Sequence, residues 1–274
     1  MKLYKGQDYR FLNKNDQLEY ERVRESERKY PLASGIRGGI RVNKFHEYPK
    51  PARHYKHLFP NNYLDTIELQ NHDNIEFTHN EVKDFIDKEP NEINTLNFIN
   101  ENEHYFFIAS LLSYYDFGHH EAYLFKELQL NTTYRADYVL VGKGSGGYQF
   151  VFIELESPTK DPFKEKGSEL SQVYQNGINQ VKSWERFLQQ QFSSLQPKFN
   201  EAKKIGENLP SEFINSDTYR RHYVVVAGRR HHYEQNPDAS YAIRRYEEQR
   251  SQIKLLHYDN LLDSTKRLIG RRTF

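Results

Sequence analysis

The sequence predicts an α/β protein, a mixed β-sheet core flanked by helices, with a small module at the N-terminus. From about residue 90, segments with helical periodicity and apolar segments typical of strands alternate along the chain. A glycine-rich turn over residues 142–147 separates two apolar strands, which predicts an antiparallel hairpin. A chain of 274 residues is long enough for one large domain, or for one domain with a smaller appendage.

The elements after residue 90 follow from their apolar spacing. Asn91–Ile99 has helical spacing, Tyr105–Tyr115 is helix-like and ends before Gly118, and Glu121–Leu130 is a short amphipathic segment. The predicted strands are Ala136–Val141, Tyr148–Glu156, His222–Ala227 and Ile253–His257. The predicted later helices are Ser168–Gln190, Ala239–Gln249 and Asp259–Leu268.

Residues 1–85 carry weaker signals. Arg37–Val42 suggests a tight turn that enters a strand, and Ile67–Leu69 and Ile75–Phe77 suggest short strands. We therefore expect a small N-terminal module of mixed or β character over 1–85, without an assigned role, and a main domain over 86–274.

Composition excludes several classes of protein. Cysteine is absent, which excludes disulfides and cysteine-ligated metal sites. No run of 18 apolar residues is present, and Met1–Tyr9 is polar, so we expect a cytoplasmic protein without a membrane partner. The segment Tyr219–Phe274 holds twelve Lys and Arg against six Asp and Glu, a weak indication of a polyanionic partner.

Three acidic residues are the most informative feature for chemistry. Asp137 opens one strand of the hairpin and Glu154 lies near the end of the other, so antiparallel pairing predicts that they are neighbours. Glu156 shares a strand face with Glu154. Three converging carboxylates are costly unless a hard divalent cation such as Mg²⁺ neutralises them. Acids at strand ends are commonly only solvated, so this spacing leaves both interpretations open.

Ordered segments over residues 90–265 resemble the Shedu anti-phage nuclease family of the restriction-endonuclease-like PD-(D/E)XK superfamily. The matching segments are Asn91–Glu92, Phe98–Asn102, Tyr134–Leu140, Phe152–Pro158, Asp161–Lys164, Gln180–Trp184, Tyr223–Arg229 and Leu255–Leu262. This resemblance implies a restriction-endonuclease-like core. The resemblance does not extend to residues 1–85.

The resemblance also implies roles for the acidic residues. Asp137 and Glu154, with the carbonyl of Leu155, would bind Mg²⁺ or Mn²⁺ for phosphodiester hydrolysis. Glu92 would be the glutamate that related nucleases hold near the site. Gln180 would orient water or a phosphate, although a solvated helix residue is an open alternative, and Trp184 is expected in the core.

One position departs from the superfamily pattern. Glu156 stands where the commonest motif has lysine, so a lysine would come from elsewhere, and Lys143, Lys160 and Lys164 are candidates. Arg229 and Arg230 follow a strand end near the implied site and are our predicted phosphate contacts, together with Lys143 and Lys160. A solvated face or a protein interface explains such basic clusters equally well.

Competing motifs are weak. Gly142–Gly147 formally matches a dinucleotide-binding loop, but a strand follows it where that loop needs a helix.

The leading hypothesis is therefore a Mg²⁺-dependent endonuclease that acts on DNA in bacterial anti-phage defence. The alternatives are a catalytically inactive nucleic-acid-binding or sensing module and a structural protein. A homo-oligomer is a further possibility.

Overall fold

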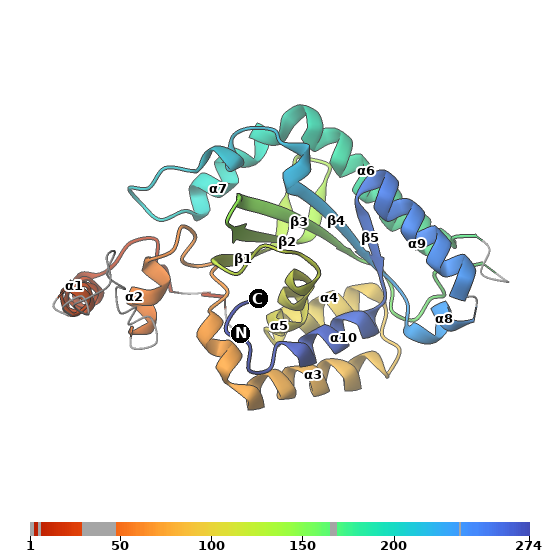
Figure 1. Cartoon of the computed structure of the whole chain (residues 1–274), viewed down its shortest axis with the longest axis horizontal. Helices are drawn as coiled ribbons and strands as arrows, with labels where there is room; N and C mark the ends of the chain where they lie inside the picture. The colour runs from red at the N-terminus through yellow and green to blue at the C-terminus, as the bar shows by residue number, and fades with distance from the viewer. Residues whose placement is uncertain (1–2, 5–6, 29–47, 165–168, 236) are drawn as a thin grey trace, which may run out of the picture.

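A five-stranded mixed sheet forms the centre of the molecule within residues 3–4, 7–28, 48–164, 169–235 and 237–274, which the computed structural model describes (Figure 1). The strand order is β1-β2-β3-β4-β5, with antiparallel pairing among the first three strands and parallel pairing from β3 to β5. The strands are β1 (Glu121–Gln129), β2 (Arg135–Gly144), β3 (Gly147–Leu155), β4 (Arg221–Val226) and β5 (Ile253–Leu256). The predicted mixed α/β architecture is confirmed.

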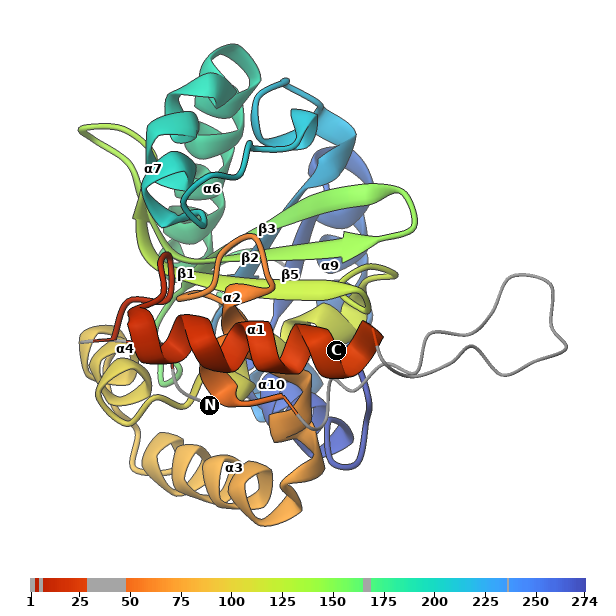
Figure 2. The same cartoon turned by 90° about the vertical axis from the view of Figure 1, so that its left-hand side faces the viewer.

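Helices cover both faces of the sheet, which makes a three-layer arrangement (Figures 1 and 2). One face packs against α3 (His72–Ile86), α4 (Glu92–Glu101), α5 (Tyr105–Ala109), η3 (Ser110–Tyr114) and α10 (Tyr258–Arg267). The other face packs against α6 (Gln172–Gln191), η5 (Phe192–Leu195) and α7 (Gln196–Ala202). Helix α9 (Pro237–Ser251) lies beside β5. The connections between elements contain the short helices η6 (Ser211–Phe213), η7 (Thr218–Arg220) and α8 (Arg230–Glu234). Val139, Phe152 and Val225 face the α6 side, and Leu140, Ile153 and Val224 face the α10 side. Both faces are apolar, as the buried strands of such a sheet require.

The segment Glu121–Leu130 is a strand, β1, rather than a separate amphipathic element before the sheet. Tyr123 and Phe125 enter the core on the α6 side, whereas Ala122 and Leu124 enter the opposite core. Because side chains of both faces are buried, the sequence shows no clean two-residue alternation that would predict this strand.

The N-terminal region was expected to have mixed or β character, but its described residues form helices joined by irregular segments, with one isolated antiparallel bridge from Tyr63 to Tyr123 of β1. They form α1 (Lys14–Arg28), α2 (Lys50–Tyr55), η2 (Thr66–Gln70) and most of α3. Ile67–Leu69 and Ile75–Phe77, predicted as strands, lie in η2 and α3. The side chains of Asp65 and Asn71 cap these helices by accepting from the N–H groups of Ile67 and Asn74. Ile75, Val82 and Ile86 have helical spacing and are buried.

Two further expectations concern the N-terminal region, a tight turn entering a strand at Arg37–Val42 and a domain boundary at residue 85. Arg37–Val42 lies outside the described residues. The division into 1–85 and 86–274 stays a prediction, and Leu69, Ile75 and Val82 belong to the same core as Leu261 of α10. In the ranges that the structure describes, no helix combines the length and the apolar character needed to cross a bilayer.

Candidate active site

The β2–β3 hairpin brings Asp137 and Glu154 together. The strands pair from Tyr138 opposite Ile153 to Gly144 opposite Gly147, and the register continued by one residue sets Asp137 against Glu154. The N–H of Leu155 donates a 2.8 Å hydrogen bond to Oδ2 of Asp137. The neighbour relation expected from the hairpin is therefore present, and backbone geometry fixes it.

Glu154 and Glu156 are buried on the α6 side of the sheet end, with 6% and 8% of their surfaces exposed. Among the described residues, Oε2 of Glu154 has no hydrogen-bond partner. The backbone of Glu156 is held on two sides, since its N–H donates to the carbonyl of Val226 at 2.8 Å and its carbonyl accepts from the Tyr258 hydroxyl at 2.8 Å. Contacts to β4 and to Tyr258 therefore fix the backbone position of Glu156.

Helix α4 adds a fourth acid from the other layer. Asn91 caps the helix by accepting from the N–H of Asn94 at 2.8 Å, so Glu92 is its first residue. The side chain of Glu92 lines the same pocket as Asp137 and Glu154 and is close enough to raise the pKa of Glu156. We call Glu92, Asp137, Glu154 and Glu156 the carboxylate cluster.

Burial and mutual repulsion make three of these acids hard to ionise. Burial, opposed by the hydrogen bond from Leu155, raises the pKa of Asp137 to about 7. Burial and then the charges of Asp137 and Glu156 raise the pKa of Glu154 well above its ordinary value. Burial and the charge of Glu92 raise the pKa of Glu156 to about 8. Clustered perturbed carboxylates of this kind are typical of functional sites.

A pocket of about 650 Å³ opens at this cluster. It is lined by Glu92, Asp137, Glu154, Leu155 and Gln180, together with Ile93, Leu96, Asn97, Glu127, Gln129, Thr133 and Arg135. Gln180 is exposed on α6 and lines the pocket, whereas Trp184 one turn later is fully buried in the core, as expected. Both helix layers and the sheet therefore contribute to one concave site.

Sequence reasoning missed Arg135 as a site residue. This arginine lines the pocket, pairs with Glu127 at 3.3 Å, and opposes the rise in the pKa of Asp137 and Glu154. Its position two residues before Asp137 could have indicated this role, because the first residues of β2 lie at the same end of the sheet.

The strands are also distorted at the site, which no sequence pattern indicated. Glu127 lies across from Asp137 in the register and adopts a left-handed φ of 47°. Leu128 and Ala136 enter the α6-side core although strict alternation would place them on the opposite face. Irregular strand geometry of this kind re-aims side chains beside active sites.

Gly177 is a second missed residue. A Cβ at this position of α6 would lie 2.8 Å from Cγ1 of Val225 and 3.0 Å from both Cγ and Oε1 of Glu156. The absent side chain therefore lets α6 approach Glu156 more closely than any other residue would allow.

The four predicted basic contacts differ in position. Lys160, exposed after β3, is close enough to lower the pKa of Glu156. Lys143 lies at the far end of β2, six residues from Asp137, or about 20 Å along an extended strand. It pairs there with Glu121 at 3.6 Å. Of these two lysines, the structure brings Lys160 and not Lys143 to the carboxylate cluster.

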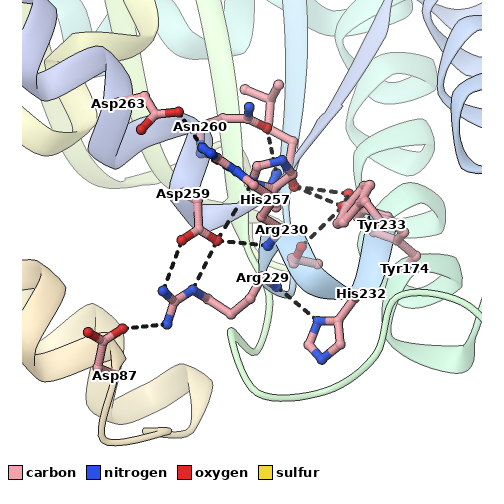
Figure 3. Close-up of polar contacts among 12 residues, drawn as sticks. Asp87, Tyr174, Arg229, Arg230, His232, Tyr233, His257, Asp259, Asn260 and Asp263 are labelled. Carbon is pink, nitrogen blue, oxygen red and sulfur yellow. Dashed lines mark hydrogen bonds and ion pairs between the residues drawn. The ribbon is translucent and has the colours of Figure 1, made fainter. Parts of the chain in front are cut away.

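Arg229 and Arg230 lie near the site, but both are paired with carboxylates (Figure 3). Arg229 holds Asp259 through two hydrogen bonds of 2.9 and 3.0 Å and Asp87 through a third of 2.9 Å. Arg230 pairs with Asp263. We call these five residues the Arg229 network. Phosphate contact by either arginine stays a prediction, and a phosphate would have to compete with an existing partner.

The donor set suits a hard divalent cation by its chemistry. Asp137 and Glu154 offer adjacent carboxylates, and the unpartnered Oε2 of Glu154 is a buried acceptor without a donor. Within the described ranges, no three His, Asp or Glu side chains are arranged to hold a metal ion. A cation would therefore have to replace the protons that the raised pKa values retain on these acids.

Comparison with protein families shows which family the chain belongs to. A family model described as Shedu protein SduA, C-terminal, matches residues 80–262, which is more than half of the sequence and includes the whole carboxylate cluster. No curated protein matches the chain. The chain belongs to the Shedu family.

Proposed function

We propose that this protein is a metal-dependent nuclease that hydrolyses phosphodiester bonds of DNA. Membership of the Shedu family suggests a role in anti-phage defence. The observation that carries the nuclease proposal is the carboxylate cluster itself. Glu92, Asp137 and Glu154 line one pocket and Glu156 follows β3 beside it, and burial and repulsion raise the pKa of Asp137, Glu154 and Glu156.

We infer a restriction-endonuclease-like core from the same arrangement. The first acid lies on the middle strand of an antiparallel trio, the second on the strand that joins this trio to the parallel strands β4 and β5, and a helix over one face lines the pocket. These features support the assignment together with the resemblance of the ordered segments.

Asp137, Glu154 and the Leu155 carbonyl would hold Mg²⁺ or Mn²⁺. When bound, such a cation activates a water molecule and stabilises negative charge on the phosphate. Burial and the neighbouring Glu92 raise the pKa of Glu156 to about 8 in the metal-free protein, so Glu156 would supply a group for proton transfer. Gln180 and Arg135 line the same pocket, where an amide and a guanidinium suit a phosphate or an attacking water.

The test uses purified protein with labelled single-stranded and double-stranded DNA, in Mg²⁺, Mn²⁺ or EDTA. We expect cleavage only with metal, and a loss of about 100- to 1,000-fold in Glu154→Ala. Glu169→Ala is the matched control, because it removes an exposed carboxylate outside the pocket.

The other outcomes separate the alternatives. Salt-sensitive DNA binding without cleavage under any metal condition would favour a nucleic-acid-binding or sensing module. Cleavage that persists in EDTA, or in Glu154→Ala, would place the chemistry elsewhere. Absence of both binding and cleavage would favour a structural role.

A further inference from the structure

We propose that Arg229 is a positioning residue that sets where Glu92 meets Glu156, by tying the end of α3 to the segments that hold Glu156. This inference rests on the proposed function for its catalytic consequence. Its structural part, a fixed contact between two layers of the molecule, stands on the contacts of the Arg229 network and is testable by itself.

The first step is that two loop segments meet beside Glu156. The N–H of Gly228 donates to the carbonyl of Ser157 at 3.0 Å, and its carbonyl accepts from the N–H of Tyr258 at 3.1 Å. The hydroxyl of Tyr258, fully buried, donates to the carbonyl of Glu156. The backbone of Glu156–Ser157 is therefore anchored by the residues directly before Arg229 and Asp259.

The second step is that Arg229 and Asp259 lock these two segments to each other. Their fork-to-fork contact is bidentate, and Oδ2 of Asp259 also accepts from the N–H of Arg230 at 2.8 Å (Figure 3). The side chains of Arg229 and Asp259 are 18% and 17% exposed, which shields the pair from solvent. A planar guanidinium held in this way has a defined direction for its remaining donor.

The third step is that this remaining donor reaches α3. Nη1 of Arg229 donates to Oδ1 of Asp87 at 2.9 Å. This hydrogen bond joins the segment after β4 to the C-terminal cap of α3, which is distant in the sequence. Figure 3 shows Asp87 approaching the guanidinium from the α3 side and Asp259 approaching it from a different side.

The fourth step is that the chain from Asp87 to Glu92 is short and stiff. Glu89 has a left-handed φ of 55° and its N–H donates to the carbonyl of Ile86 at 3.0 Å, Pro90 has a fixed φ, and Asn91 caps α4. The position of Asp87 therefore sets the start of α4, where Glu92 lines the pocket with Asp137 and Glu154 and lies close enough to Glu156 to raise its pKa. Arg229 thus positions Glu92 through Asp87, and the segments next to Arg229 and Asp259 position Glu156.

The test variant is Asp87→Asn, which removes the charge that Arg229 holds and leaves the Arg229–Asp259 pair in place. We expect kcat for DNA cleavage to fall about ten- to hundred-fold, because misplacement of a catalytic group by about 1 Å has effects of this size, with little change in KM. Lys83→Ala is the matched control. It removes the other partner of Asp87, on α3 itself, and should leave kcat unchanged.

A double-mutant comparison distinguishes positioning from general destabilisation. In a Glu92→Gln background, Asp87→Asn should cause little further loss, because the group that it positions is already altered. Equal losses in both backgrounds, or wild-type kcat in Asp87→Asn, would overturn the proposal.

A second readout does not depend on activity. The N–H groups of Asn94 and Thr95 are held by Asn91, so their hydrogen exchange reports how firmly α4 begins. We expect faster exchange in Asp87→Asn and unchanged exchange in Lys83→Ala. If the wild type cleaves no DNA, the proposed function fails, whereas unchanged exchange in Asp87→Asn overturns the positioning role.

Discussion

The carboxylate cluster and the Arg229 network lie near each other at the ends of neighbouring strands of the sheet. They differ in whether their carboxylates are paired with cations. In the Arg229 network each carboxylate has a cationic partner. Burial disfavours the charge of Asp259, but hydrogen bonds from Arg229 and Arg230 outweigh it and hold its pKa at about 2. In the carboxylate cluster the acids face one another, and Glu154 Oε2 has no partner among the described residues. Removing one partner of a buried ion pair destabilises a structure, whereas clustered buried acids with raised pKa values are typical of functional sites.

The two regions should therefore respond to pH with opposite signs. The acids of the cluster have folded-state pKa values above their ordinary ones, so their contribution to stability is complete below about pH 4 and is lost as pH rises toward about 8. For metal-free protein we expect the free energy of unfolding to fall by on the order of a few kcal/mol over this range. Denaturant unfolding at several pH values measures it.

Two variants sharpen this comparison. Glu154→Gln should flatten the loss of stability toward pH 8, and Mg²⁺ should oppose that loss in the wild type. Asp259 has a lowered pKa, so its contribution is present above about pH 3.8 and is lost as pH falls toward about 2. Asp259→Asn should remove this acid limb and lower stability throughout the range above it, whereas its profile between about pH 4 and 8 should keep the wild-type slope. A flat wild-type profile above pH 5 would contradict our account of the cluster.

Removing a partner from the paired region should also lower stability near neutral pH. Asp259→Asn leaves the largely buried guanidinium of Arg229 with Asp87 alone, and we expect a loss of about 2 kcal/mol in the free energy of unfolding. Asp263→Asn removes an exposed pair with Arg230 and should cause no measurable change. Equal effects in urea unfolding would show that burial does not distinguish the two pairs.

Packing against the cluster offers a smaller effect. In Gly177→Ala the new Cβ would press on Val225 and Glu156, so α6 must shift outward. We expect a loss of about 1–2 kcal/mol in stability together with reduced cleavage. Gly146→Ala is the matched control, because a Cβ there would meet no atom within 4 Å. Wild-type cleavage by Gly177→Ala would show that this contact does not set the geometry of Glu156.

The smallest effect is expected at the far end of the hairpin. Lys143 pairs with Glu121 away from the pocket, so Lys143→Ala should change kcat by less than about threefold. Arg135→Ala, which removes the arginine of the pocket, should weaken DNA binding and reduce cleavage more strongly. The opposite ranking in cleavage and in salt-dependent binding would show that DNA follows the hairpin rather than the pocket.

The hairpin shows how much of the site could be predicted. The turn between two apolar strands fixes an antiparallel register, so local pattern alone predicts that Asp137 and Glu154 are neighbours. Glu92 was implied by resemblance alone, because its approach depends on how α4 packs across the other layer. Gly177 and Glu127 carried no visible signal, since a close helix contact and a left-handed residue in a strand depend on neighbours distant in the sequence.

The basic residues show the limit of composition. An excess of positive charge near the C-terminus favours Arg229 and Arg230 as phosphate contacts. Their acidic partners Asp87, Asp259 and Asp263 lie about 30 or more residues away, and only the folded chain shows the pairing.

Local periodicity and one turn are enough to predict the alternation of strands and helices after residue 90, the hairpin, and the pair Asp137–Glu154. Tertiary packing was needed to show that β1 is a strand with both faces buried, that helices dominate the described N-terminal region, and which charges are paired. These features depend on burial and on charges brought together from separate segments, which period and composition do not encode.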